Sequence, residues 1–196
     1  MNKIIVGLLL SIIISLSIFF NCFDSTMSII FILGLYELIK HIINSKNKLI
    51  IIVGIIIVIV SNEFISQNII SVDETIIVGI IIVISDCFQE YSGKFYGKNK
   101  IGWISPNKTI EGYIGGYIGI LCYYFLTNCN FFYISSIYLL GISGDLFFSY
   151  IKRLLTIKDY SNLLLSHGGI LDRFDALIFA LCGIGLYKKC CEIKNG

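Results

Sequence analysis

Ionisable side chains gather in two glycine-containing stretches of an otherwise apolar sequence. Residues 86–112 combine an aspartate with two Gly-Lys pairs and a Ser-Pro-Asn-Lys-Thr run, and residues 145–175 carry four aspartates, a Lys-Arg pair and a His-Gly-Gly turn. Carboxylates are the hard oxygen ligands that Mg²⁺ prefers, and Lys and Arg neutralise phosphates. The two stretches together therefore predict a site for a divalent metal and a phosphate-rich ligand.

The first stretch begins at Asp86 and contains two cations that follow glycines. Lys94 and Lys98 are four residues apart, so one helical turn would place both on the same face. A single Gly-Lys pair is more often a solvated loop. The repeat of the pair at helical spacing favours a binding surface for an anion.

A helix start is expected at the end of the same stretch. Ser105 is a good N-cap residue and Pro106 suits the first helical position. The free N–H groups of such a start, with Lys108 beside them, would form an anion site. Thr109 and Glu111 then lead back into an apolar run. Taken singly, Ser-Pro is more often a plain helix start than a binding site.

The second stretch opens inside an apolar run. Asp145, Ser149 and Lys152 share a helix face, and Arg153 follows where the run ends. Ionised carboxylates at or near hydrocarbon depth are costly, so they are usually paired, metal-bound or functional. These residues are therefore candidates for metal and phosphate binding.

The stretch closes on a turn and a new helix. His167, Gly168 and Gly169 form the turn, after which Asp172 and Asp175 share a helix face. One alternative is purely structural, with Asp145 and Asp172 ion-paired to Lys152 and Arg173 to tie two helices together. That alternative explains two charges but not the clustering of so many ionisable groups.

The elements that must position these residues are membrane helices. The chain has 196 residues, of which 56% are hydrophobic and 14% charged. The charged share is about half of that of a soluble domain, which excludes a soluble globular enzyme, a disordered tail and a secreted disulfide scaffold. A net charge of +2 is too small to indicate a nucleic-acid partner. The seven cysteines show no metal-ligand spacing, so free thiols are expected.

Apolar runs predict an all-α, polytopic transmembrane helical protein with six to seven membrane segments. The runs cover residues 4–20, 28–43, 49–60, 75–91, 110–126, 131–150 and 170–186. The third is short, since its residues would span roughly 18 Å of a hydrocarbon core ~30 Å thick. It must extend past Ser61 or be a partial span. We divide the chain into N-terminal segments, 1–74, and a catalytic region, 75–196, within one integral membrane unit without a linker.

The distribution of Lys and Arg predicts the orientation. Residues 21–26, 62–74 and 128–130 contain neither, whereas the alternate connections are basic. The positive-inside rule therefore places the N-terminus and two long loops, 87–108 and 151–169, in the cytosol, where the active site of this multi-pass protein would face. Three lysines of the C-terminal tail then fall on the other side. We expect one segment to be re-entrant or miscounted.

Both stretches resemble motifs of one enzyme family. Residues 149–175, which read S-x-x-K-R, then K-D, then H-G-G-x-x-D-R-x-D, are similar to the signature of the phosphatidate cytidylyltransferases, the CDP-diacylglycerol synthases. Residues 86–112 resemble the same family's D-x₆-G-[KR]-x-x-G-[KR] followed by S-P-x-K-T-x-E-G. The resemblance covers about residues 80–187. One departure is Leu165-Ser166, where the family usually has Pro-Gly.

The resemblance implies a reaction in phospholipid biosynthesis. CTP and phosphatidate would be the substrates, and CDP-diacylglycerol and diphosphate the products. Mg²⁺ would be bound by Asp145 and Asp172, with room for a second, monovalent cation. A homodimer is left open. The catalytic candidates are Lys152, Arg153, Asp159, His167, Arg173 and Asp175. The substrate-binding candidates are Asp86, Lys94, Lys98, Ser105, Lys108, Thr109, Glu111, Ser149, Gly168 and Gly169.

Other functions compete with this one. A CTP-dependent lipid kinase or a CDP-archaeol-type synthase would use a similar site, although the His-Gly-Gly turn and the K-D element favour the diacylglycerol-type enzyme. A small membrane transporter could line its pathway with Asp145 and Asp172, but the chain shows no internal duplication of the kind common in transporters. A catalytically inactive membrane scaffold descended from the enzyme is a further alternative.

Overall fold

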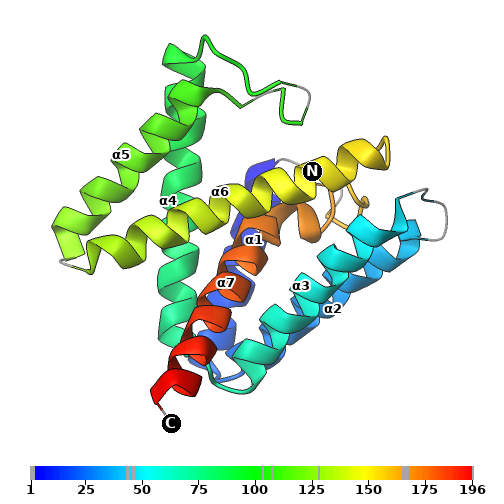
Figure 1. Cartoon of the computed structure of the whole chain (residues 1–196), viewed down its shortest axis with the longest axis vertical. Helices are drawn as coiled ribbons and strands as arrows, with labels where there is room; N and C mark the ends of the chain where they lie inside the picture. Colours follow the sequence, from blue (N-terminus) through cyan, green and yellow to red (C-terminus); the bar gives the residue numbers. More distant parts are fainter. Residues whose placement is uncertain are drawn as a thin grey trace.

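The computed structural model describes residues 3–42, 45, 47–102, 104–106, 108–127, 129–164 and 168–195. Within these ranges the chain forms seven α-helices and no strand (Figure 1). The helices are α1 (Lys3–Phe19), α2 (Phe23–Ile42), α3 (Lys48–Ser66), α4 (Val72–Tyr96), α5 (Ile110–Thr127), α6 (Phe131–Leu154) and α7 (Leu171–Asn195). The all-α prediction is therefore confirmed.

Each predicted apolar run forms a helix, but several helices extend further than the run. The third run does not stop at Val60, because α3 continues to Ser66. Helix α4 runs to Tyr96 and α6 to Leu154, so much of the predicted loop 87–108 and the start of the loop 151–169 are helical. The predicted loop lengths are wrong on this point. The charged residues at these helix ends are good helix formers, and α4 ends only at the cap residue Gly97.

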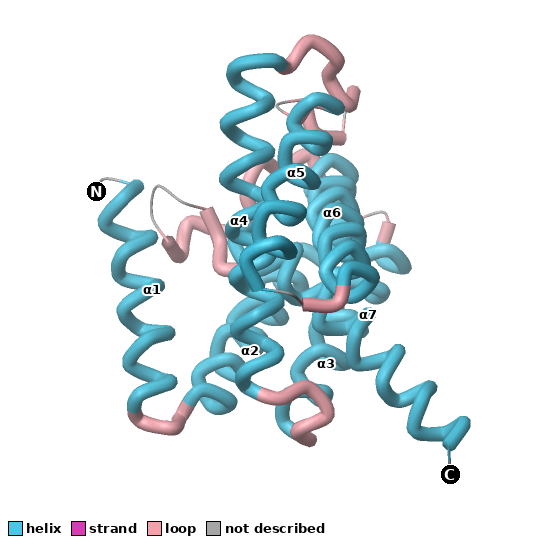
Figure 2. Tube along the Cα trace, turned by 90° about the vertical axis from the view of Figure 1, so that its left-hand side faces the viewer, coloured by secondary structure: helices cyan, strands magenta, loops and turns pink. Residues whose placement is uncertain are grey.

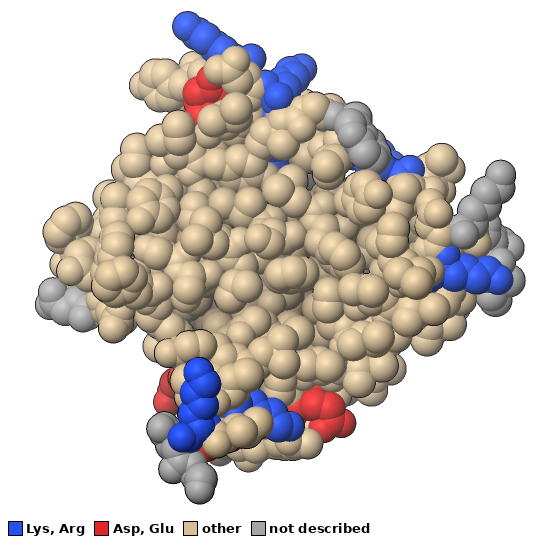
Figure 3. Space-filling view, viewed as in Figure 1, with Lys and Arg blue, Asp and Glu red and all other residues tan. Residues whose placement is uncertain are grey.

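By length and composition, three of the described helices, α2, α3 and α6, are long and apolar enough to cross a membrane. The surface agrees with this. Figure 3 shows a broad face without charged side chains, and the visible Lys, Arg, Asp and Glu lie near its margins. Exposed apolar side chains are abundant on these helices, for example Ile32, Ile56 and Leu139. Such a surface is stable in contact with lipid rather than water.

Helices α4 and α5 pack closely, and the N-terminal part of α5 lies beside α4 (Figures 1 and 2). Glycines line the contact face of α5 at positions 112, 115, 116 and 119. A Cβ at Gly116 would lie 2.5 Å from Cγ of Gln89 and 3.1 Å from the carbonyl oxygen of Ser85. Small residues at this spacing let two membrane helices approach closely. The close approach fixes the segment between α4 and α5.

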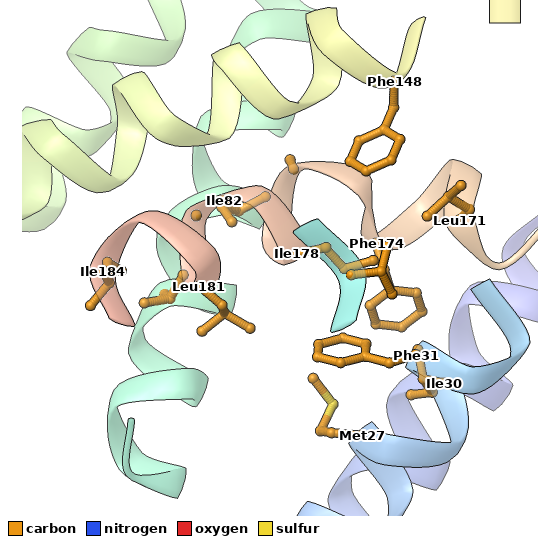
Figure 4. Close-up of a cluster of buried hydrophobic side chains, with 14 of the residues drawn as sticks. Met27, Ile30, Phe31, Ile82, Phe148, Leu171, Phe174, Ile178, Leu181 and Ile184 are labelled. Carbon is orange, nitrogen blue, oxygen red and sulfur yellow. The ribbon is translucent and has the colours of Figure 1, made fainter. Parts of the chain in front are cut away.

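The hydrophobic core is centred on α7. Leu171, Phe174 and Ile178 are buried there, and Figure 4 shows Phe31 of α2 and Phe148 of α6 in the same cluster. One buried polar contact joins α3 to this helix, since the Ser61 hydroxyl donates to the carbonyl oxygen of Ile178 at 2.8 Å. Contacts from α2, α3, α4 and α6 therefore hold α7 in place.

The C-terminal end of α7 lies beside the connection between α3 and α4. Lys188 donates to Glu74 at 2.5 Å and to the carbonyl oxygen of Ile69 at 3.1 Å. The helix continues without interruption through the tail lysines to Asn195. Among the described residues, the last apolar run and the tail lysines therefore belong to one continuous helix, and the re-entrant or miscounted segment stays a prediction. The tail therefore lies at the same end of the molecule as residues 62–74, which contain no Lys or Arg.

We predict that Gly116→Leu separates α4 from α5. The added side chain would overlap Gln89 and the backbone of Ser85, and overpacking of this kind costs about 1–3 kcal/mol. Thermal unfolding in detergent should show the loss. The matched control is Gly79→Ala on α4, where a Cβ would meet nothing within 4 Å, so stability should stay equal or rise. Equal unfolding temperatures for Gly116→Leu and the wild type would contradict the packing role of the glycines.

Candidate active site

A polar cavity of about 590 Å³ lies where α4, the start of α5, α6 and α7 meet. Carboxylates and cations line it together, which is the combination predicted for a metal and a phosphate-rich ligand. The described lining residues are Asp86, Gln89, Glu90, Gly93, Lys94, Lys108, Thr109, Gly112, Tyr113, Asp145, Asp172, Arg173 and Asp175. Both sequence stretches therefore contribute to one cavity.

Lys108 and Asp145 form the ion pair that crosses this cavity. Nζ of Lys108 lies 2.5 Å from Oδ2 of Asp145, and both side chains are largely buried. Burial acts to lower the pKa of Lys108, but the carboxylates of Asp145 and Asp86 outweigh it and hold that pKa above the usual value. The ammonium also lies 5.7 Å from the ring centroid of Tyr113. Lys108 therefore stays charged at any physiological pH.

The segment that presents Lys108 differs from the prediction. Helix α5 starts at Ile110 rather than at Pro106, and Thr109 caps it, because its hydroxyl accepts the N–H of Gly112 at 3.1 Å. The backbone carbonyl oxygen of Ser105 instead accepts the N–H of Lys108 in a turn. The predicted N-cap was wrong because the local Ser-Pro signal does not include the packing of the buried Thr109 against α4.

The two predicted lysines of the first stretch do not share a helix face. Lys94 lies in the last turn of α4, lines the cavity and pairs with Glu90 at 2.5 Å. Lys98 lies beyond the end of α4, and its N–H donates to Glu111 at 3.1 Å. Glu111 also accepts from the backbone and side chain of Asn99. Glu111 therefore holds the loop and, with Lys98, lies outside the described cavity lining.

Asp172 is the most heavily hydrogen-bonded carboxylate of the site. Its Oδ1 accepts from Nζ of Lys152 at 2.8 Å, and its Oδ2 accepts the N–H groups of Tyr160 and Gly169, each at 2.9 Å. Gly168 has φ +79°, a left-handed conformation that suits glycine. The carboxylate therefore fixes the turn that delivers the chain to α7. The Lys152 pair matches part of the structural alternative considered from sequence.

The remaining candidates lie around the cavity rather than in it. Arg153 donates from Nε to the carbonyl oxygen of Ile104 at 3.1 Å and so joins the end of α6 to the loop before α5. Ser149 is buried on α6 and Asp159 is exposed beside Gly168. His167 lies outside the described residues. Some of the predicted site residues thus line the cavity, and others bond to the segments that form its walls.

Glu37 of α2 is a functional candidate to which the sequence motifs gave no weight. Its side chain is almost fully buried, and its two oxygens accept the N–H groups of Ile170 and Leu171, each at 2.9 Å. Ser161 donates to it at 2.5 Å. The carboxylate therefore caps the N-terminus of α7, where a negative charge is favoured. In the sequence, Glu37 is marked by its place towards the end of an apolar run and by a faint resemblance of this segment to the family's N-terminal part.

Two further residues of the cavity were also missed. Oε1 of Gln89 and the hydroxyl of Tyr113 are buried and have no hydrogen-bond partner among the described residues, yet both residues line the cavity. Buried polar atoms without a partner are costly, so they mark positions where a ligand or water would bind. Their spacing from the charged motifs gave no signal, because only the fold turns them into the same space.

The donor set allows a shared metal site. Among the described residues, no three His, Cys, Asp or Glu side chains come together as a metal-binding group. Mg²⁺ commonly uses one or two carboxylates and completes its shell with phosphate oxygens and water. Asp145 and Asp172, which line the same cavity, fit a site of that kind.

Comparison with known proteins agrees with the chemistry of this cavity. A family model, that of the Cytidylyltransferase family, matches residues 2–191. The chain belongs to the cytidylyltransferase family. Members named phosphatidate cytidylyltransferase include one from Aquifex aeolicus, 44% identical over 105 residues, and one from Helicobacter pylori, 35% identical over 116. A Staphylococcus aureus protein of the same name is 40% identical over 114 residues.

These cytidylyltransferases are longer than the matched region. The three alignments cover 50%, 54% and 52% of this chain, and 40%, 43% and 44% of the relatives. The chain therefore matches less than half the length of these curated relatives. The family resemblance predicted from the two motifs is confirmed.

We predict that Glu37→Gln destabilises the start of α7. The substitution replaces one carboxylate oxygen by an NH₂ group, which would face a backbone N–H of Ile170 or Leu171 instead of accepting from it. We expect this to lower the free energy of unfolding by about 2 kcal/mol. The temperature of thermal unfolding in detergent and the turnover rate should both fall. Glu63→Gln, at an exposed glutamate of α3, is the control and should leave both unchanged. Equal effects of the two variants would exclude the capping role.

Proposed function

We propose that the chain is a phosphatidate cytidylyltransferase, which transfers CMP from CTP to phosphatidate and releases diphosphate. The observation that carries the proposal is the polar cavity, in which both family motifs place carboxylates and cations side by side. The names of the relatives from three bacteria support the same substrates.

The reaction needs no covalent enzyme intermediate. A phosphatidate oxygen attacks the α-phosphorus of CTP in line, a new P–O bond forms, and the bond to the β-phosphate oxygen breaks with its electron pair on diphosphate. The protein contributes positioning and charge neutralisation. Lys108, from the first motif, and Arg173, from the second, both line the cavity and would bind the phosphates. Gln89 and Tyr113 offer hydrogen bonds to the nucleoside.

We propose Mg²⁺ as the cofactor, held by Asp145 and Asp172 with the nucleotide phosphates. When bound, the metal would neutralise charge on the phosphates. The carboxylates of Asp172 and Asp145 would hold the metal in place of their present partners, Lys152 and Lys108. Lys152 and Lys108 would then be available to phosphate oxygens. The exchange keeps Asp145 and Asp172 each beside a cation.

We further propose that the protein is multi-pass and that its active site faces the cytosol, where CTP is available. The two motif segments meet at one end of the bundle, which supports a shared compartment. Arg153 bonds the loop before α5, and Lys108 of that loop bonds Asp145 of α6. The phosphatidate acyl chains would stay in the bilayer while the head group meets CTP.

The proposed activity predicts transfer of label from α-phosphate-labelled CTP into lipid. Membranes containing the protein, given phosphatidate, should form CDP-diacylglycerol, and EDTA should stop the reaction until Mg²⁺ is restored. Asp145→Asn should lower turnover about 100-fold or more, because it removes a metal-binding charge while keeping the shape. The control Asp73→Asn, exposed in the first turn of α4, should keep full activity.

Different results would decide against parts of this proposal. Label in lipid only from γ-phosphate-labelled CTP would show a lipid kinase instead. Activity that persists in EDTA would exclude the metal. If Asp145→Asn is inactive and also unfolds at a much lower temperature than Asp73→Asn, the aspartate is structural rather than catalytic.

The proposed topology predicts accessibility of single cysteines in a background cleared of native thiols. Lys100→Cys and Asn162→Cys, in the two motif segments, should react with an impermeant reagent from the same side of sealed vesicles. Thr127→Cys, at the far end of α5, should react only from the other side. All three positions are exposed. Labelling of positions 100 and 162 from opposite sides would separate the motifs by a membrane and exclude one active site.

A further inference from the structure

A second cavity, of about 440 Å³, lies between α1, α2, α4 and α7. Its walls are mostly apolar side chains, among them Ile14, Met27, Ile80 and Leu177. Arg173 is the one charged residue among its described lining residues. We call this cavity the apolar groove.

Arg173 connects the apolar groove to the polar cavity, because it lines both. The first turns of α7 separate the two spaces. Asp172 and Asp175 line the polar cavity, whereas Phe174 and Leu177 line the apolar groove. A ligand that reaches from one space to the other would therefore pass the guanidinium of Arg173.

The lining side chains of helix α4 also change from apolar to charged along its length. Thr75 to Ile84 supply the α4 lining of the apolar groove, and Asp86 to Lys94 supply that of the polar cavity. Ile76 and Asp86 are ten residues apart, or about 15 Å along a helix axis. One helix thus presents an apolar surface followed by a charged one, which matches an amphiphile with an anionic head and a long tail.

We infer that the apolar groove binds one acyl chain of the phosphatidate substrate, with the lipid phosphate at Arg173; this rests on the proposed function. A water-sized group occupies ~30 Å³, so the groove has room for on the order of fifteen groups of methylene size. That is enough for one acyl chain. The second chain stays in the bilayer. The placement holds the phosphate at the mouth of the polar cavity, where CTP would be attacked.

Gly79→Phe tests the inference by filling the apolar groove. A Cβ at Gly79 meets nothing within 4 Å, and replacing a helical glycine does not lower helix propensity, so the variant should fold. The ratio of kcat/KM for dioleoyl phosphatidate to that for dihexanoyl phosphatidate should fall about tenfold, because burial of chain methylenes is lost. Ile118→Phe, on an exposed face of α5, should leave the ratio unchanged. An unchanged ratio in Gly79→Phe would overturn the inference.

Photolabelling separates this inference from the proposed function, because it does not need turnover. Phosphatidate with a diazirine on one acyl chain should label α1, α4 or α7 at the apolar groove of the wild-type protein in nanodiscs, and unlabelled phosphatidate should compete. Competition by phosphatidylcholine to the same extent would show ordinary bilayer lipid and overturn the inference. Specific labelling without CDP-diacylglycerol formation by the wild type would instead reject the proposed activity.

Discussion

Ion pairs and hydrogen bonds to three carboxylates, Glu37, Asp145 and Asp172, hold the segments of this protein together around the start of α7. An unpaired charge in surroundings of this kind costs several kcal/mol. Asp145 therefore carries Lys108, Asp172 carries Lys152 and two backbone N–H groups, and Glu37 carries the first N–H groups of α7. These bonds join α2, α6, α7 and the loop before α5. The cavity exists because the bonds hold its walls together.

The sequence predicts the helices well and their ends less well. A run such as 131–150 is apolar enough that any fold must make it a helix, and α6 begins at the predicted Phe131. Its extension to Leu154 and that of α4 to Tyr96 involve charged residues, which are good helix formers but give no apolar signal. The apolar run placed the start of α5 correctly at residue 110, whereas the Ser-Pro signal placed a helix start too early, because Ser105 and Thr109 are both good caps. Packing of Thr109 against the glycines of α4 decides between them.

The candidate site was predictable where chemistry lies in a motif and hidden where it depends on contact between distant segments. Asp145, Asp172 and Lys108 were found from residue type and spacing. Glu37 lies more than a hundred residues from its partners Ile170 and Leu171, so no local pattern connects them. Gln89 was hidden for a similar reason, because only the close approach of α5 turns its side chain into the cavity wall.

The pairing of carboxylates with lysines also explains how a membrane protein can keep a charged cavity beside apolar helices. In the cavity as described, Asp145 is balanced by Lys108, and Asp172 is balanced by Lys152 from its edge. A ligand that brings phosphates together with a divalent cation satisfies the lysines and the carboxylates at once. A phosphate alone would satisfy the lysines and leave the carboxylates without a cation, and a metal alone would do the reverse. Charge balance in the cavity would therefore favour the proposed metal–nucleotide complex before any contact with the base is made.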